Sequence, residues 1–206
     1  MKKILFCNIP MKDKTDKCKY DSDDLSVPVS DREVVYPINA FLEKTMTAED
    51  ELKLVLLVKK DPYGNYKKNA EAFLAEFSEV NQEVQAKYTY TIIDTEFSEE
   101  KAIHEQLMSR IVDELEDNSQ VLADITYGPK DLPVVLFYAL NFAEKFLGCD
   151  IENIIYGQAN FGANSKPENT KICDMVPLFY LNTVTNTIHC DTSEKARKTL
   201  KSLLSL

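Results

Sequence analysis

Two short segments of the chain end an apolar run with residues that could hold an anion. The first is Asn8-Ile9-Pro10, and the second extends from Asp124 to Asp131 and leads into a helical pattern. The N-terminus of a helix presents unpaired backbone N–H groups and a partial positive charge, both of which favour phosphate. These segments are therefore the first place to expect a ligand.

The second segment has side chains suited to a nucleotide. Gly128 and Pro129 would bring backbone close to a ligand, and Lys130 adds a positive charge. Thr126 supplies a hydroxyl, and Tyr127 supplies a ring that can stack on a base. The same residues are also typical of an ordinary strand-to-helix turn, so their types alone leave both interpretations open.

The sequence lacks the motifs of several common enzyme and metal-binding classes. The glycine patterns of dinucleotide-binding folds, of P-loop NTPases and of α/β-hydrolases are absent. The two histidines, His104 and His189, and the five cysteines show no zinc-ligand spacing. We therefore expect no metal site and no cofactor, and we expect reduced thiols in a cytoplasmic protein.

Composition restricts the partners further. The formal net charge is −10, whereas a protein that binds long nucleic acid normally presents a basic face. The start of the chain has too short an apolar stretch for a signal peptide or a membrane span. We expect no long nucleic acid and no membrane as partners.

The elements that must position the two segments alternate between strand and helix. Apolar runs predict five strands, and 3.6-residue periodicity predicts helices between them. This order is typical of an α/β fold: a Rossmann-like, doubly wound, mostly parallel sheet with helices on both faces. Ligands of such sheets bind at the carboxyl ends of the strands, where the strand order reverses. The predicted strands are 3–8, 52–58, 88–93, 121–126 and 151–156, with 52–58 and 121–126 as inner strands.

Helices are predicted near 38–42, 70–80, 103–115, 132–147 and 193–204. Asp131 is expected to cap the helix at 132–147, and Gly148 to end it. Residues 10–32 and 158–170 are expected to be loops, and 181–188 has both helical and strand character. We expect one domain, 1–206, with its core at about 1–158 and a C-terminal extension at about 171–206.

Four segments, in this order and spacing, resemble the CARF family of CRISPR-associated proteins. The stretch from Val121 to Gly128 is similar to the family's DxTHG motif, with Tyr127 in place of His, and Leu132-Pro133 follows it as in the family. The other similar segments are Tyr36-Pro37-Ile38-Asn39-Ala40, Ile154-Ile155-Tyr156-Gly157 and Asp174-Met175-Val176-Pro177-Leu178-Phe179.

The resemblance implies a homodimer that binds a cyclic oligoadenylate across its two-fold axis, as a sensor of type III CRISPR defence. It also implies a possible metal-free ring nuclease, in which a ribose 2′-hydroxyl attacks its own phosphodiester and leaves a 2′,3′-cyclic phosphate. Thr126 and Lys130 are the candidate catalytic residues. The alternative is a stand-alone doubly wound interaction or regulatory protein without messenger cleavage. The candidate ligand-binding residues are Asn8, Ile9, Pro10, Thr126, Tyr127, Gly128, Pro129 and Lys130.

Overall fold

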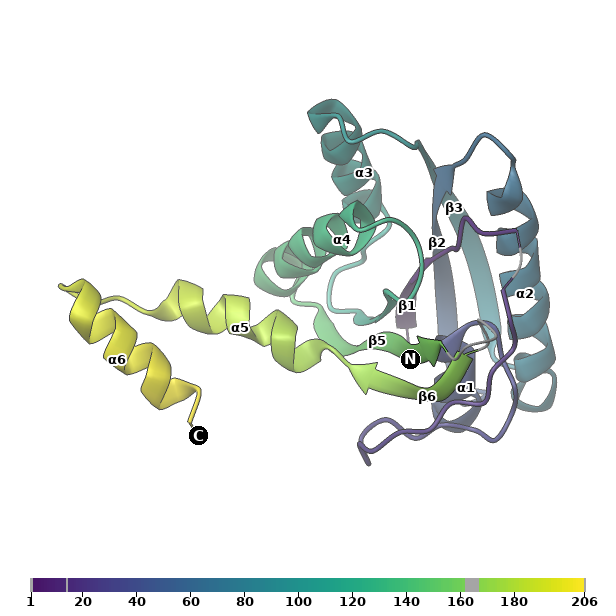
Figure 1. Cartoon of the computed structure of the whole chain (residues 1–206), viewed down its shortest axis with the longest axis horizontal. Coiled ribbons are helices and arrows are strands. Elements are labelled where there is room, and N and C mark those ends of the chain that lie inside the picture. The colour runs from purple at the N-terminus through teal and green to yellow at the C-terminus, as the bar shows by residue number, and fades with distance from the viewer. Residues whose placement is uncertain (1, 14, 162–166, 206) are drawn as a thin grey trace. The chain divides into compact units, whose positions relative to one another are not determined.

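The computed structural model describes residues 2–13, 15–161 and 167–205, and it divides into two compact units, Met1–Asp174 and Met175–Leu206. The first unit is built on a six-stranded sheet with the order β3-β2-β1-β4-β5-β6 (Figure 1). Neighbouring strands from β3 to β5 are parallel, and β6 is antiparallel to β5. The strands are β1 (Lys2–Asn8), β2 (Glu51–Lys60), β3 (Lys87–Glu96), β4 (Gln120–Asp124), β5 (Asp150–Phe161) and β6 (Pro167–Asp174).

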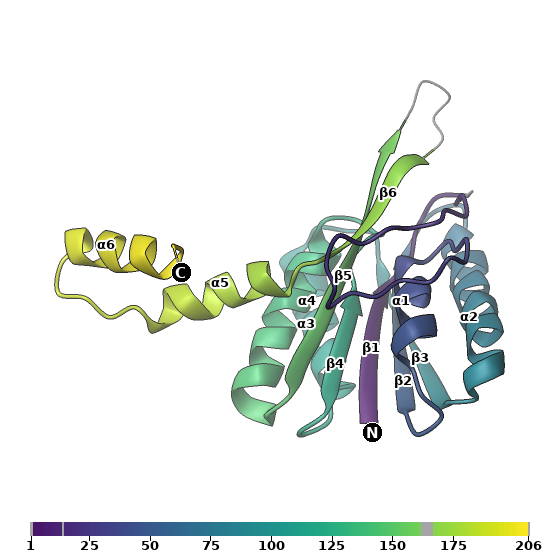
Figure 2. The same cartoon turned by 90° about the horizontal axis from the view of Figure 1, so that it is seen from below.

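The predicted fold class is confirmed, and so is the placing of β2 and β4 inside the sheet. Helices α1 (Pro37–Thr45) and α2 (Asn65–Val84) cover one face of the sheet (Figure 2). Helices α3 (Lys101–Asp113) and α4 (Asp131–Phe142) cover the other. Helix α4 continues as a five-residue π-helix, Ala143–Leu147, and Gly148 ends it at φ +66°.

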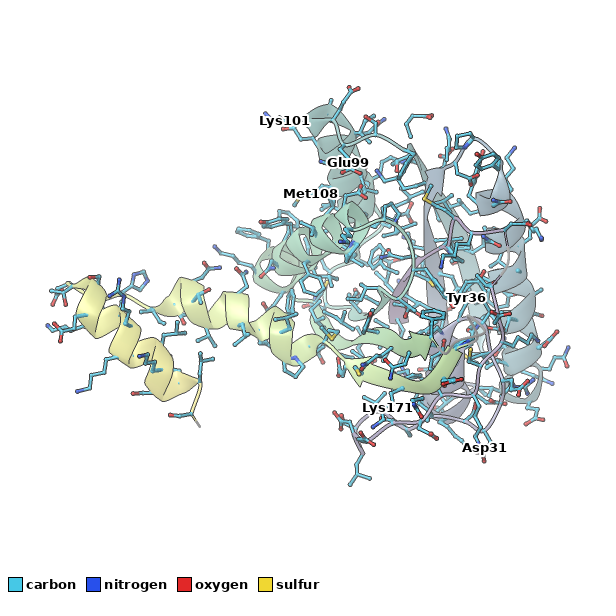
Figure 3. All side chains as sticks on the ribbon, in the orientation of Figure 1. Asp31, Tyr36, Glu99, Lys101, Met108 and Lys171 are labelled. Atoms are coloured by element: carbon cyan, nitrogen blue, oxygen red, sulfur yellow. The ribbon has the colours of Figure 1, made fainter. Side chains whose placement is uncertain are left out.

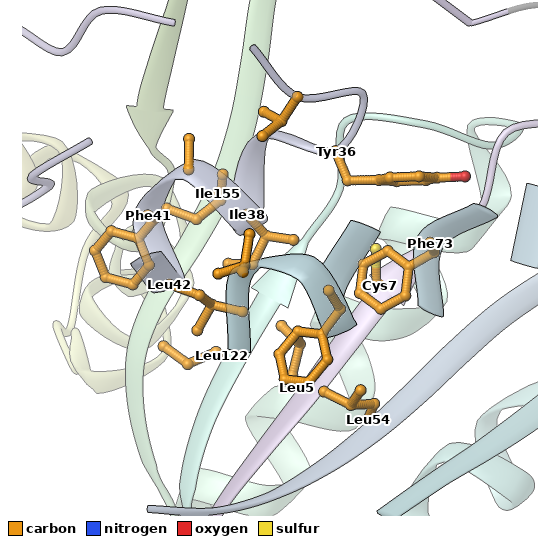
Figure 4. Packing of buried hydrophobic residues seen from close by; sticks show 14 of the residues in the cluster. Leu5, Cys7, Tyr36, Ile38, Phe41, Leu42, Leu54, Phe73, Leu122 and Ile155 are labelled. Atoms are coloured by element: carbon orange, nitrogen blue, oxygen red, sulfur yellow. The ribbon is translucent and has the colours of Figure 1, made fainter. Parts of the chain in front are cut away.

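A continuous apolar core lies between the sheet and helices α1 and α2 (Figure 4). Leu5 and Cys7 of β1 contribute to it with Leu54 of β2, and Ile38 and Phe73 close it from the two helices. Because side chains alternate along a strand, the intervening residues of β1 and β2 face α3 and α4. Both faces are buried, which explains the nearly continuous apolar run of β2.

The structure corrects the predicted loop at 158–170. Strand β5 continues to Phe161, and β6 begins at Pro167. Most residues of β6 are polar and only partly buried, so this edge strand has no apolar pattern that could predict it. The described residues of the loop 10–32 form no helix or strand, but Cys18 pairs with Val34 through two backbone hydrogen bonds.

The second unit contains α5 (Val176–Thr187) and α6 (Ser193–Leu203). In α5 the helical spacing of the apolar residues outweighs the strand-like alternation of its threonines. Helix α6 begins where predicted, and Thr192 caps it by accepting a hydrogen bond from the amide of Lys195 at 3.3 Å. Within the described ranges, the helices are too short or too polar to cross a membrane.

Candidate functional site

The reversal of strand order in this sheet falls between β1 and β4. The chain proceeds from β1 to β2 on one side, and it crosses after β3 to β4 on the other side of β1. Asn8 ends β1 and Asp124 ends β4, so both predicted segments lie at the carboxyl edge of this switch point. This is the place where a doubly wound sheet leaves a crevice for a ligand.

A pocket of about 500 Å³ opens at this edge. Five of the predicted site residues line it: Pro10, Thr126, Tyr127, Gly128 and Pro129. The other three do not. Asn8 and Ile9 are buried below the surface, and Lys130 is exposed outside the lining.

Aromatic side chains dominate the remaining wall. Tyr20, Phe97, Tyr156 and Phe161 join Tyr127 around the pocket, although only Tyr127 was predicted. Among the described lining residues, Lys12 is the sole cation and Asp16 the sole carboxylate, and both come from the loop 10–32. Lys12 and Asp16 were not predicted because a loop has no periodic pattern from which the direction of a side chain can be inferred.

The turn after β4 is fastened to β5 by Thr126. Its Oγ1 accepts a hydrogen bond from the amide of Gly157 at 2.8 Å. Gly157 itself has no room for a side chain, since a Cβ would lie 2.4 Å from Cγ of Pro37 and 3.2 Å from Cγ2 of Thr126. The Thr126 hydroxyl therefore holds β4, β5 and the start of α1 in close contact while the residue also lines the pocket.

Asp124 is fully buried below this turn and joins it to α1. One carboxylate oxygen accepts from the amide of Thr126 at 2.8 Å, and the other accepts from the amide of Ile38 at 3.1 Å. Burial raises the pKa of Asp124 to about 6, hydrogen bonds from Thr126 and Ile38 oppose that shift, and the nearby charge of Glu76 adds to it. At neutral pH the ionised group faces the positive end of α1.

Tyr127 is anchored as well. Its hydroxyl donates to the carbonyl oxygen of Val35 at 2.7 Å, and its ring meets that of Tyr36 edge-on, with centroids 5.9 Å apart. Burial raises the pKa of Tyr127, so the phenol stays protonated. The hydroxyl has a structural role, and what Tyr127 offers to the pocket is part of its ring.

Asn8 lies directly under Gly128. Gly128 has φ +83°, and a Cβ there would lie 2.7 Å from Cδ1 of Leu132 and 3.6 Å from Cβ of Asn8. The Asn8 side chain is fully buried, and neither of its amide atoms has a hydrogen-bond partner in the described part of the chain. A buried amide without a hydrogen-bond partner is uncommon in folded proteins.

The predicted capping role of Asp131 is wrong. Asp131 is the first residue of α4, Lys130 occupies the cap position, and no side chain caps the helix. The Asp131 carboxylate instead forms an ion pair with Lys59, with 2.7 Å between Oδ2 and Nζ. The amide groups at the start of α4 are thus left without a side-chain cap beside Gly128 and Pro129.

A scan against protein-family models finds no match for this chain, and a search of curated proteins finds no significant match.

Proposed function

We propose that this chain is a sensor domain of the CARF type that binds a cyclic oligoadenylate at the switch point of its sheet. The observation that carries the proposal is the aromatic-walled pocket at the carboxyl edge of β1 and β4. Bases bind proteins largely by stacking on aromatic rings, and five such rings surround this volume. A cavity of about 500 Å³ falls in the range typical of small-molecule sites.

Two of the four segments that resemble the CARF family line this pocket and the other two contact them, which supports the proposal. Thr126, Gly157 and Pro37 come from three of them and lie in mutual contact. The fourth contributes Asp174, which accepts hydrogen bonds from the Asn153 side chain at 2.7 Å and the Ile154 amide at 3.0 Å.

Phosphate groups would find donors at the turn that begins α4. The amides at the start of α4 have no side-chain cap, and helix N-termini favour anions. Lys12 lines the pocket, while Lys130 stands at the helix start outside the lining. We propose Lys12 as the principal charge contact and Lys130 as a second contact for a ligand that extends beyond one pocket.

The arrangement favours binding over ring cleavage. The Thr126 hydroxyl already accepts a hydrogen bond from Gly157, and Tyr127 donates its proton to a backbone carbonyl. Protonated threonine and tyrosine hydroxyls are also too weakly basic to take a proton from a ribose hydroxyl, which a general base must do. We propose that Thr126 positions the turn and that messenger cleavage, where it occurs, is slow.

The proposed homodimer has a suitable surface on α4 and its extension. Val134, Tyr138 and Phe146 are 56%, 63% and 64% exposed, and the ring of Phe142 lies 5.1 Å from that of Phe146. An exposed apolar stripe of this kind marks an interaction surface. Because α4 starts at the pocket, pairing of two such helices would bring two pockets to one cyclic ligand, as two-fold symmetry requires.

The test is calorimetric titration of the protein with cyclic tri-, tetra-, penta- and hexa-adenylate, with linear oligoadenylates as controls. We expect one ring size to bind at one ligand per two chains. Tyr156→Leu removes a stacking ring and should weaken binding by roughly 1–3 kcal/mol, about one to two decades. The matched control is Tyr63→Leu, since Tyr63 is exposed and lies outside the pocket lining.

Chromatography of the same samples measures whether the ring is cleaved. Absence of binding for every ring size would overturn the messenger proposal and leave the interaction-protein alternative. Equal loss of affinity in Tyr156→Leu and Tyr63→Leu would show that the ligand binds elsewhere.

A further inference from the structure

Four charged or ionisable side chains meet where α3 and α4 begin. Asp131 is the first residue of α4, His104 lies in the first turn of α3, and Glu99 precedes that helix. Nε2 of His104 is 3.3 Å from Oε2 of Glu99 and 3.5 Å from Oδ2 of Asp131. Lys59, near the end of β2, pairs with Asp131. Figure 3 labels Glu99 next to α3.

Much of this cluster is buried without hydrogen bonds. The Asp131 side chain is 6% exposed; Lys59 engages its Oδ2, and its buried Oδ1 has no partner among the described residues. Nε2 of His104 is also buried without a hydrogen bond. Thr95 pairs with Lys59 across β2 and β3, so it faces the same side of the sheet, and its buried hydroxyl has no partner in the described ranges either.

The atoms that face one another here are chiefly electron-pair donors. An imidazole nitrogen and two carboxylates lie within 4.8 Å of one another, and this arrangement is stable when a proton on Nε2 or a bound cation lies between them. The Lys59 ammonium supplies such a charge at Oδ2 of Asp131. Among the described residues, Lys59 forms no ion pair with Glu99. The second oxygen of Asp131 remains free to face a cation.

We propose that Glu99, His104 and Asp131 form a binding site for a divalent transition-metal ion. One imidazole and two carboxylates suit zinc and its neighbours in the first transition row better than magnesium or calcium, which prefer oxygen alone. Three protein ligands leave a coordination position for water or an outside group. The Glu99 side chain is 66% exposed, which gives the ion a path from solvent.

The metal site is separate from the nucleotide pocket. None of its three ligands lines that pocket, although Phe97 and Pro129, which do, each lie two positions before a ligand. The proposal therefore does not depend on the proposed function, and a titration with metal alone tests it without any nucleotide.

The experiment uses the full chain, freed of metal with a chelator and then titrated with Co²⁺, whose visible absorption bands report coordination by protein ligands. We expect one Co²⁺ per chain, displaced by Zn²⁺. His104→Gln should weaken Co²⁺ binding about tenfold or more, since even outer-shell changes at metal sites reach that size. His189→Gln is the matched control and should bind as the wild type does.

Circular dichroism of each variant without metal checks that it folds. Should His104→Gln fail to fold, Glu99→Gln decides the matter, because Glu99 is largely exposed, with exposed Glu105→Gln as its control. Absence of Co²⁺ bands in the wild type would overturn the proposal. Binding that persists unchanged in His104→Gln, or in Glu99→Gln where that variant decides, would also overturn it.

Discussion

The carboxylate of Asp124 at the end of β4 accepts a hydrogen bond from the amide of Ile38 at the start of α1, at 3.1 Å. These residues are 86 positions apart, and the bond joins two of the segments that resemble the CARF family. A buried group with a raised pKa also makes stability depend on pH.

We expect Asp124 to make the protein less stable as pH rises from about 4 to about 6. Its pKa is about 6 in the folded protein and 3.8 in a model peptide, so only the folded state keeps the proton between these values. The free energy of unfolding therefore decreases with rising pH in this window, by about 2–3 kcal/mol from this group, and is constant above it. Urea denaturation of wild type and Asp124→Asn across pH 4–7 measures the difference, which should shrink over the window. A difference that grows with pH would contradict the prediction.

Gly157→Ala should lower the free energy of unfolding of the first unit, because the added methyl group would clash with a neighbouring side chain. A Cβ at this position would lie 2.4 Å from Cγ of Pro37, and overpacking of this kind typically costs about 1–3 kcal/mol. The double variant Pro37→Ala with Gly157→Ala removes the obstructing ring atom, so it should be more stable than the sum of the single changes predicts. Strict additivity in denaturant unfolding would show that the contact is not responsible.

Tyr127→Phe should affect stability and leave ligand affinity nearly unchanged. The variant loses the 2.7 Å hydrogen bond to Val35 but keeps the ring that faces the pocket. We expect a loss of about 0.5–1.5 kcal/mol in the free energy of unfolding. Affinity for cyclic oligoadenylate is measured in parallel, and a tenfold loss there would assign the hydroxyl to the ligand.

Lys59→Met should be strongly destabilising because it leaves the buried Asp131 carboxylate without its ion-pair partner. Removing one member of a buried pair typically costs about 3–5 kcal/mol. Adding Asp131→Asn to Lys59→Met should recover part of that loss, since no charge then remains buried. Both are measured in the presence of a chelator so that metal binding does not contribute. A double variant no more stable than Lys59→Met would show that the charge is not the cause.

Tyr138→Glu should shift the protein toward monomer. The side chain is 63% exposed in the middle of the apolar stripe on α4, where a charge would face its symmetry mate across the proposed dimer. Sedimentation analysis at several concentrations measures the effect. Tyr63→Glu, exposed but remote in sequence from the stripe, is the control and should sediment as the wild type does.

Elements with a strong apolar or strand-type pattern were predictable, and the polar edge strand β6 was not. Strand β2 lies between two layers of helices and is apolar along most of its length, so its pattern is unmistakable. Strand β6 lies at the sheet edge, where exposure removes the apolar pattern and leaves a sequence that resembles a loop. Prediction of α4 was correct in extent but wrong about Asp131, because an acidic residue at a helix start has the same appearance whether it caps the helix or pairs with a lysine from a strand.

The candidate site was predictable at two strand ends, namely Pro10 after β1 and the turn after β4. The residues from Thr126 to Pro129 were found because a strand that ends in a glycine turn before a helix points to the carboxyl edge. Tyr20 and Phe97 lie in the same pocket but come from loops whose course depends on tertiary contacts. Nothing in the spacing of Glu99, His104 and Asp131 links them, since their approach depends on two helices that begin side by side.

The bonds that close the pocket join residues far apart in the chain, and this has a kinetic consequence. Tyr127 reaches back 92 positions to Val35, and Asp124 reaches back 86 to Ile38. Contacts between such distant residues require a large loss of loop-closure entropy before they form, so we expect the pocket to form late in folding. A partly folded first unit then has no pocket. A ligand that binds only the formed pocket should therefore slow global unfolding rather than protect one region.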